Sequence, residues 1–119
     1  MMRPSNELPV VFLCREAVDF RKGINCLAIL VEEMLEQDPF SEQLFVFCNR
    51  TRDKVKILYW ESSGFCLWQK TLEKARFKWP RNDDHEVVTL TGQQLNWLFD
   101  GYDIGRLQPH EKLLYHIVL

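Results

Sequence analysis

The chain has 119 residues, the usual length of a single domain, and 46% of them are hydrophobic, which is enough to bury a core and argues against extensive disorder. No window reaches the roughly 18 consecutive apolar residues of a membrane span, and the first residues lack the apolar core of a signal peptide. We therefore expect one cytoplasmic domain over residues 1–119, in which residues 1–8 and 110–119 are candidates for loosely ordered tails.

The charge is distributed unevenly along the chain. Residues 1–49 carry 4 Lys/Arg and 8 Asp/Glu, residues 50–81 carry 9 and 3, and residues 82–119 carry 2 and 6. The three segments have net charges of −4, +6 and −4, although the whole chain has a net charge of only −2. This asymmetry singles out the cationic middle segment as the candidate binding region.

The first predicted elements are a strand and an amphipathic helix. The apolar, partly β-branched run Pro9–Cys14 is typical of a buried strand. From Ile24 onward, apolar residues recur at helical spacing and form one apolar face. We expect this helix to end near Gln37–Asp38, because Pro39 disfavours helical geometry in the residue before it.

Three strand candidates follow one another closely. They are the wholly apolar run Leu44–Cys48 and the two longer runs Asp53–Trp60 and Phe65–Leu72. Each link between them has four residues, whereas a parallel crossover needs about a dozen or more. The sequence therefore predicts an antiparallel β-meander.

The C-terminal part predicts shorter elements. Ala75–Trp79 and Glu86–Leu90 are further strand candidates, and Thr91 can cap a short helix that ends near Gly101. The segment after Pro109 is ambiguous between a strand, a helical turn and a loose tail. Together the elements predict an α+β fold, in which an antiparallel meander sheet is packed by one main amphipathic helix and followed by a short C-terminal helix.

No recognisable catalytic signature is present. The chain lacks a nucleophile elbow and a phosphate-binding loop, and an H-E-x-x-H zinc motif beginning at His110 fails at Leu114. A nuclease would need carboxylates that converge on Mg²⁺. The candidates occur in contexts that are ordinary for turns and loops, namely Asp19, Asp53, Asp83, Asp84 and Asp103. We expect no enzyme, no metal and no cofactor, and a metal-dependent nuclease is the weakest alternative.

The four cysteines predict neither a zinc site nor a disulfide. Zinc sites usually contain close pairs such as C-x-x-C, and disulfides are rare in the cytosol. The chain has no such pair, and each cysteine lies in an apolar stretch. We therefore expect buried, reduced, structural thiols at Cys14, Cys26, Cys48 and Cys66.

The cationic middle segment contains the candidate binding residues. Alternate residues of a strand share one face, so Lys54 and Lys56 should project together beside the turn. If the strands form a meander, one positive surface can combine Arg50, Arg52, Lys54, Lys56, Lys70, Lys74, Arg76 and Lys78.

Three interpretations of this surface remain open. Phosphate backbones are attracted to such a surface, and Trp60, Trp68 and Trp79 could stack on unpaired bases. Alternating lysines are also the ordinary solvated face of a sheet, in which case the tryptophans belong to the core. A docking site for an acidic protein is the third interpretation.

Six short motifs occur in a specific order along the chain. They are V-D-F-R-K-G at 18–23, D-P-F-S at 38–41, L-F-V-F-C-N at 44–49, D-K-V-K-I-L-Y-W at 53–60, G-F-C-L-W-Q-K at 64–70 and F-K-W-P at 77–80. In this order and spacing they resemble the TnpB-type accessory protein, the second open reading frame product, of the insertion-sequence-sixty-six family of bacterial transposable elements. The resemblance extends from about Val11 to Gly101.

The resemblance implies a helper that is encoded beside a larger transposase and needed for transposition, without an established activity of its own. It assigns no role to the matching motif residues, which are Asp19, Arg21, Lys22, Gly23, Asp53 and Trp60. Two roles are open for the first motif: it closes a turn before the helix, or it contacts DNA directly. Cys48 replaces a basic residue of many relatives, and Ile104-Gly105 replaces an expected tryptophan.

We therefore predict a non-enzymatic accessory protein of an insertion sequence that binds DNA, at the element ends or in the transposase complex. The basic residues would contact phosphates and position the protein rather than read the base sequence. The alternative is an adaptor that docks the transposase without touching DNA.

Overall fold

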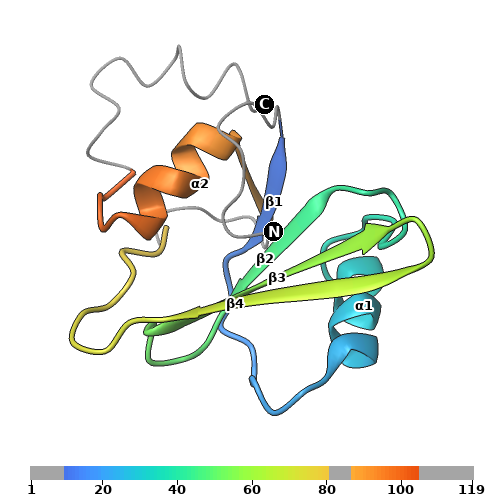
Figure 1. The fold of residues 1–119 in the computed structure, drawn as a ribbon, viewed down its shortest axis with the longest axis horizontal. Helices are drawn as coiled ribbons and strands as arrows, with labels where there is room; N and C mark the ends of the chain where they lie inside the picture. Colours follow the sequence, from blue (N-terminus) through green and yellow to red (C-terminus); the bar gives the residue numbers. More distant parts are fainter. Residues whose placement is uncertain (1–9, 81–86, 105–119) are drawn as a thin grey trace.

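The computed structural model describes residues 10–80 and 87–104, which form a five-stranded sheet with one helix on each face (Figure 1). In chain order the elements are β1 (Val11–Cys14), α1 (Ile24–Glu33), β2 (Leu44–Cys48), β3 (Lys54–Glu61), β4 (Gly64–Thr71), β5 (Val87–Leu90) and α2 (Gly92–Phe99). The predicted α+β class, the main helix and the short C-terminal helix are confirmed. Within the described ranges, no helix is long and apolar enough to cross a membrane.

The strand order is β4-β3-β2-β1-β5. The predicted meander is confirmed for β2, β3 and β4, which pair antiparallel through their short links. β1 lies parallel to β2, because the chain between them contains α1 and is long enough to return to the same end of the sheet. The sheet is therefore mostly antiparallel, with one parallel pair in its centre.

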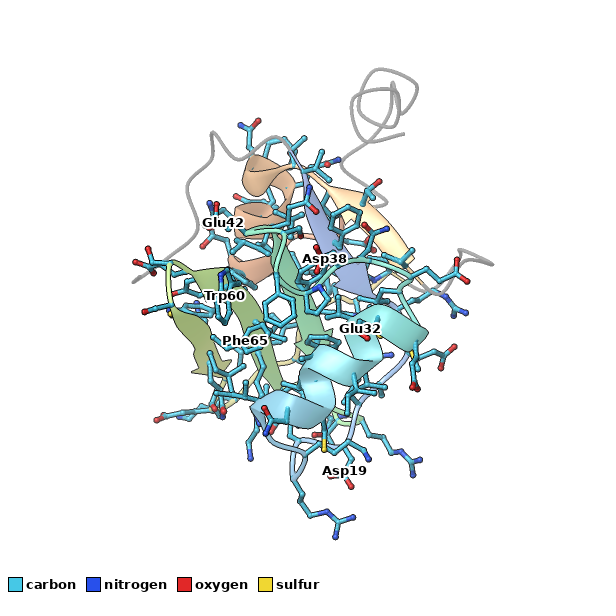
Figure 2. The ribbon with its side chains drawn as sticks, turned by 90° about the vertical axis from the view of Figure 1, so that its right-hand side faces the viewer. Asp19, Glu32, Asp38, Glu42, Trp60 and Phe65 are labelled. Carbon is cyan, nitrogen blue, oxygen red and sulfur yellow. The ribbon has the colours of Figure 1, made fainter. Side chains whose placement is uncertain are left out.

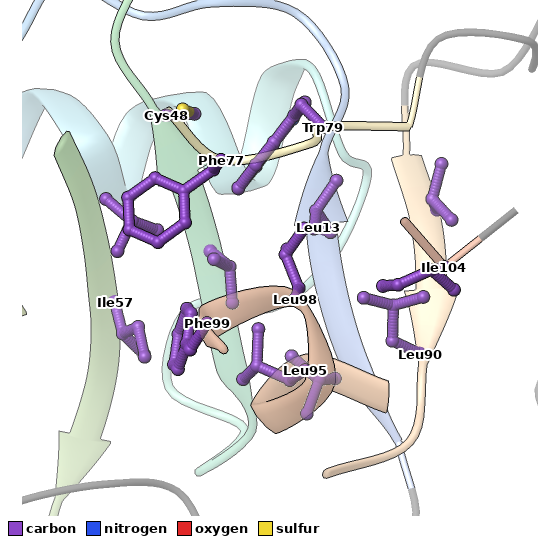
Figure 3. Close-up of a cluster of buried hydrophobic side chains, with 14 of the residues drawn as sticks. Leu13, Cys48, Ile57, Phe77, Trp79, Leu90, Leu95, Leu98, Phe99 and Ile104 are labelled. Carbon is purple, nitrogen blue, oxygen red and sulfur yellow. The ribbon is translucent and has the colours of Figure 1, made fainter. Parts of the chain in front are cut away.

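Two hydrophobic cores lie on opposite faces of the sheet. On one face, Leu27 and Val31 of α1 pack against Phe45 and Leu58, and Figure 2 shows α1 lying across the strands. Strand alternation directs the intervening side chains to the other face. There α2 and the segment after β4 close the second core, which includes Ile57 (Figure 3).

α1 ends earlier than the sequence predicts. Its last residue is Glu33, whereas the apolar pattern and Pro39 placed the end near Gln37–Asp38. The amides of Met34 and Leu35 both bond to the carbonyl of Leu30, and Glu36 then adopts a left-handed conformation with φ of 54°. The helical pattern misleads here because Leu35 is buried although it lies beyond the helix.

The predicted strand Ala75–Trp79 is wrong. This segment is irregular, and its alternation arises because Phe77 and Trp79 insert into the second core while their neighbours face solvent. The amide of Phe77 bonds to the Arg52 carbonyl at 2.7 Å, and Trp79 Nε1 donates to the Cys14 carbonyl at 3.1 Å. The segment is therefore a cover for the core rather than a sixth strand.

The predicted capping of α2 by Thr91 is confirmed. Thr91 and Gln94 form a reciprocal capping box at the start of α2.

The prediction of four buried thiols is wrong. Cys14 and Cys48 are buried as expected, but Cys26 is exposed on α1 and Cys66 is half-buried on β4. The predicted tails 1–8 and 110–119 and the ambiguous segment after Pro109 lie outside the described residues.

Candidate nucleic-acid interface

Two motif segments that are distant in sequence meet at one end of the sheet. The loop before α1 and the turn between β2 and β3 line one surface cavity, whose walls are Ala17, Val18, Asp19, Phe20, Arg21, Asn49, Arg50, Thr51 and Lys54. A backbone hydrogen bond of 2.9 Å from Val18 N to Cys48 O joins the two segments. The cavity therefore brings the motif at 18–23 beside Lys54, which belongs to the motif at 53–60.

The loop is organised by an ion pair between Asp19 and Arg21. The Arg21 guanidinium donates to both Asp19 carboxylate oxygens at 2.8–3.1 Å, and the Arg21 amide donates to Asp19 Oδ1 at 2.9 Å. These hydrogen bonds lower the pKa of Asp19 to about 2, and the pair raises the pKa of Arg21. Asp19, the only carboxylate that the described residues contribute to the cavity wall, is thus held by a cation, and Lys22, which follows Arg21, is exposed.

Gly23 has no conformational need to be glycine. It is the N-cap of α1 in an extended conformation with φ of −84°, and an added Cβ would meet no atom within 4 Å. Because glycine has no side chain, α1 has no side-chain capping hydrogen bond at this position. This placement agrees with a structural role for the first motif, as a turn that leads into the helix. It does not explain why residue 23 is a glycine.

Lys56 holds the loop in place. Only 8% of this residue is exposed, and its Nζ donates to the Phe20 carbonyl at 3.0 Å. Nζ also lies 4.7 Å from the centroid of the Phe20 ring, a cation–π arrangement. Lys56 was predicted to contact phosphate, but its ammonium group is directed into the protein.

The turn between β2 and β3 is built on polar side chains. Asp53 accepts hydrogen bonds from Thr51 Oγ1 at 2.6 Å and Asn49 Nδ2 at 2.7 Å, and these bonds lower the pKa of Asp53. Asn49 Oδ1 in turn accepts from the amides of Asp53 and Lys54. This network fixes Lys54, half-buried, and Arg50, exposed, at the cavity wall.

Arg52 has a different orientation from its neighbours in the turn. It has a left-handed backbone with φ of 62°, and its guanidinium carbon lies 5.7 Å from the Trp79 ring centroid. The guanidinium is also close to the Cys48 thiol, whose pKa is raised by burial and lowered to a smaller extent by Arg52. Arg52 therefore belongs to the boundary of the second core.

The eight predicted basic residues do not form one continuous row. Lys70 pairs with Val55 across β3 and β4, so it projects to the α2 face, opposite Lys54. Lys74, Arg76 and Lys78 are exposed on residues 72–80, the segment after β4 that covers the second core (the covering segment). The Phe77–Arg52 backbone bond joins this segment to the turn. The structure thus brings Arg21, Arg50 and Lys54 together at the cavity, with Lys22 exposed next to Arg21 and the basic covering segment beside the turn.

The tryptophans are not available as base-stacking platforms beside this cavity. Trp79 is buried, and Trp68 stacks on Phe99 with ring centroids 5.3 Å apart. Trp60, one of the motif residues, lies at the far end of β3 in contact with Phe40 and Phe65. The candidate interface is therefore a phosphate-type surface rather than an aromatic one.

Within the described ranges 10–80 and 87–104, no three His, Cys, Asp or Glu side chains come together, so these residues offer no ligand set for a metal ion. Asp19 pairs with Arg21, and Asp53 serves the turn network. Asp83, Asp84 and the three histidines lie outside the described residues.

Sequence comparison matches residues 9–109 to the family of IS66 Orf2-like proteins. Two uncharacterized proteins of Sinorhizobium fredii, y4hO and y4jC, are each 32% identical to the chain, over 102 and 108 residues. The first alignment covers 86% of this chain and 88% of the relative, and the second covers 91% of each. No solved structure matches the chain.

Proposed function

The chain belongs to the family of IS66 Orf2-like proteins, and we propose that it supports transposition as an accessory protein that binds the phosphate backbone of DNA. The binding surface is the rim of the cavity between the loop before α1 and the β2–β3 turn. The observation that carries the proposal is that basic residues from two segments distant in sequence line this cavity, Arg21 from the loop and Arg50 and Lys54 from the turn and the start of β3. Lys22, next to Arg21, is exposed.

The charge of this rim favours an anionic partner. Arg21, Lys22 and Arg50 are exposed and Lys54 is half-buried, while the Asp19 carboxylate in the cavity wall is paired with Arg21. Lys74, Arg76 and Lys78 extend the positive charge along the adjacent covering segment. A surface of this kind binds phosphates by releasing condensed counterions, so its affinity depends steeply on salt.

The rim is also held in a fixed geometry. Lys56 holds the loop through the Phe20 carbonyl, and the Asn49–Asp53 network holds the turn. Preorganised donors lose less conformational freedom when they bind a partner. Such contacts position a protein on a duplex without specifying a base sequence.

The test is a comparison of two lysine reversals on neighbouring rungs of the same strand pair. Lys54 pairs with Thr71 and Lys70 pairs with Val55, and both lysines are half-buried, but they project to opposite faces of the sheet. Binding to an element-end duplex is measured by fluorescence anisotropy at about 50 to 200 mM salt, the range over which several phosphate contacts change affinity by orders of magnitude.

Lys54→Glu should reduce the affinity at least about tenfold and lower the slope of log affinity against log salt by about one. Lys70→Glu, which makes the same change in net charge, should have a small effect. Equal losses in both variants would show that only the overall charge matters. Absence of salt-dependent binding by the unmodified chain would overturn the proposal.

A further inference from the structure

Three aromatic side chains form a cluster at the end of β3 that is remote from the basic rim. The ring centroids of Phe40, Trp60 and Phe65 are 4.9 to 5.3 Å apart, so each ring contacts the other two. Trp60 and Phe65 pair across the β3–β4 hairpin, and Phe40 comes from the loop between α1 and β2. We call these three residues the aromatic cluster.

The aromatic cluster is displayed on the surface. Phe40 is 51% exposed, and Trp60 and Phe65 are half-buried. The loop that presents Phe40 is fixed, because the Asp38 carboxylate accepts a hydrogen bond from the Phe40 amide at 2.9 Å and the buried Pro39 anchors the chain beside it. An exposed aromatic patch on a rigid loop is a common feature of a protein-binding site.

The surroundings of the aromatic cluster are acidic. Between Lys22 and Arg50 the sequence contains no Lys or Arg and five carboxylates. All five are exposed: Asp38 and Glu42 lie within two residues of Phe40, whereas Glu32, Glu33 and Glu36 lie at the end of α1 and just after it. Glu61, which follows Trp60, is exposed as well. Figure 2 shows Trp60 and Phe65 beside the segment that carries Asp38 and Glu42. This charge disfavours the approach of a nucleic-acid backbone.

We propose that the aromatic cluster is a docking site for a basic segment of a partner protein that carries a large apolar side chain. The apolar side chain would pack on Phe40, and flanking Lys or Arg side chains would pair with the carboxylates. Cations can also stack on the faces of Trp60 and Phe65, which strengthens the preference for a basic segment. Charge complementarity selects this partner over an acidic protein or DNA.

The position of this site suggests how the protein acts. β3 has eight residues, which span about 25 Å, and it connects the basic rim at Lys54 to the aromatic cluster at Trp60. One molecule can thus contact DNA at one end of the strand and a basic protein at the other. The second contact does not depend on the first, so each can fail without the other.

The test uses the isotope-labelled full chain and a short synthetic peptide with one Phe among Lys and Ser residues. Amide and indole signals are followed during the titration, and matched peptides replace the Phe by Ala or each Lys by Glu. Phe40→Ala is compared with Tyr102→Ala, because Tyr102 is an aromatic residue with nearly the same exposed fraction, 52%, and lies beyond α2.

Peptide binding should shift the signals of residues 38–42 and 60–65, and both substituted peptides should bind at least about tenfold more weakly. Phe40→Ala should weaken binding to a similar extent, and Tyr102→Ala should leave it unchanged. Equal binding by the Phe40 variant and the unmodified chain would overturn the proposal. Shifts of the same residues upon simple concentration, without peptide, would also overturn it and would assign the cluster to self-association.

Discussion

The two ends of β3 combine aromatic and charged residues in opposite ways. At the basic end the aromatic rings are covered and the cations are displayed: Trp79 is 3% exposed beneath Arg52, whereas Arg50 is exposed. At the other end the rings are displayed and the charges around them are negative, with Phe40 half in solvent beside Asp38. Residue type alone therefore does not identify a binding group; burial decides whether a ring or a cation supports the fold or faces a partner.

The largest expected effect separates the aromatic residues of the two ends. Trp79→Ala should lower the free energy of unfolding by about 3–5 kcal/mol, because it opens the second core and removes the hydrogen bond to the Cys14 carbonyl. Phe40→Ala should lower it by about 1 kcal/mol or less, since half of that side chain is in solvent. Urea unfolding followed by circular dichroism measures both. Similar losses in the two variants would show that Phe40 is a structural residue and would weaken the docking proposal.

The next prediction compares the stability effects of substituting two lysines of β3. Lys56→Ala should destabilise the protein by about 2–3 kcal/mol, because it removes a charged hydrogen bond to Phe20 O and the packing of the lysine stem. Lys54→Ala should change stability by about 0.5 kcal/mol or less and should weaken DNA binding instead. Urea unfolding and anisotropy on the same two variants test this division. The comparison would fail if Lys54→Ala were the more destabilising change.

Much of the fold follows from local patterns in the sequence. The four-residue links predict the β2–β3–β4 meander, and Thr91 predicts the start of α2, because these features depend on nearby residues alone. The end of α1 and the segment Ala75–Trp79 are predicted wrongly. Leu35 and Trp79 are buried because they pack against distant parts of the chain. Such residues extend the apolar pattern of a helix or strand in the sequence, although the helix or strand itself has already ended.

The candidate interface is harder to predict from the sequence. Sequence reasoning finds Arg50 and Lys54, but it cannot show that the Asp19–Gly23 loop lies beside them, because that meeting depends on the parallel pairing of β1 with β2. It also assigns Lys56 and Lys70 to the surface of Lys54. Strand parity places Lys70 on the other face, and the Phe20 carbonyl takes up the Lys56 ammonium group.

The aromatic cluster gives a weak signal in the sequence. Trp60 and Phe65 could be recognised as a cross-strand pair of the predicted hairpin, but Phe40 follows a proline in a loop and has no periodicity. The stronger signal is the absence of Lys and Arg between Lys22 and Arg50. In the sequence this stretch is simply part of the acidic N-terminal segment, and its place next to exposed rings is visible only in the folded chain.

The smallest expected effect concerns Asp19, a carboxylate in the wall of the cavity. Asp19→Asn should increase DNA affinity by about two- to fivefold, because it releases the Arg21 guanidinium for phosphate and removes a negative charge. Glu16→Gln is the matched control: Glu16 pairs with Arg15 at 3.1 Å in the same loop but does not line the cavity. Equal gains in the two variants would trace the effect to net charge and would remove Arg21 from the interface.

The same variant has a signature in acid. The pKa of Asp19 is lowered from 3.8 to about 2 in the folded chain, so the ion pair stabilises the fold above pH 4 and its contribution is lost as the pH falls from about 4 to 2. Acid unfolding of the unmodified chain should therefore be steeper in this range than that of Asp19→Asn. Because Asp19 stays ionised above pH 4, protonation does not release Arg21 at neutral pH. If the two acid-unfolding curves coincided, the Asp19–Arg21 pair would not contribute to the stability of the fold, and the loop would be held by the hydrogen bond from Lys56 to the Phe20 carbonyl instead.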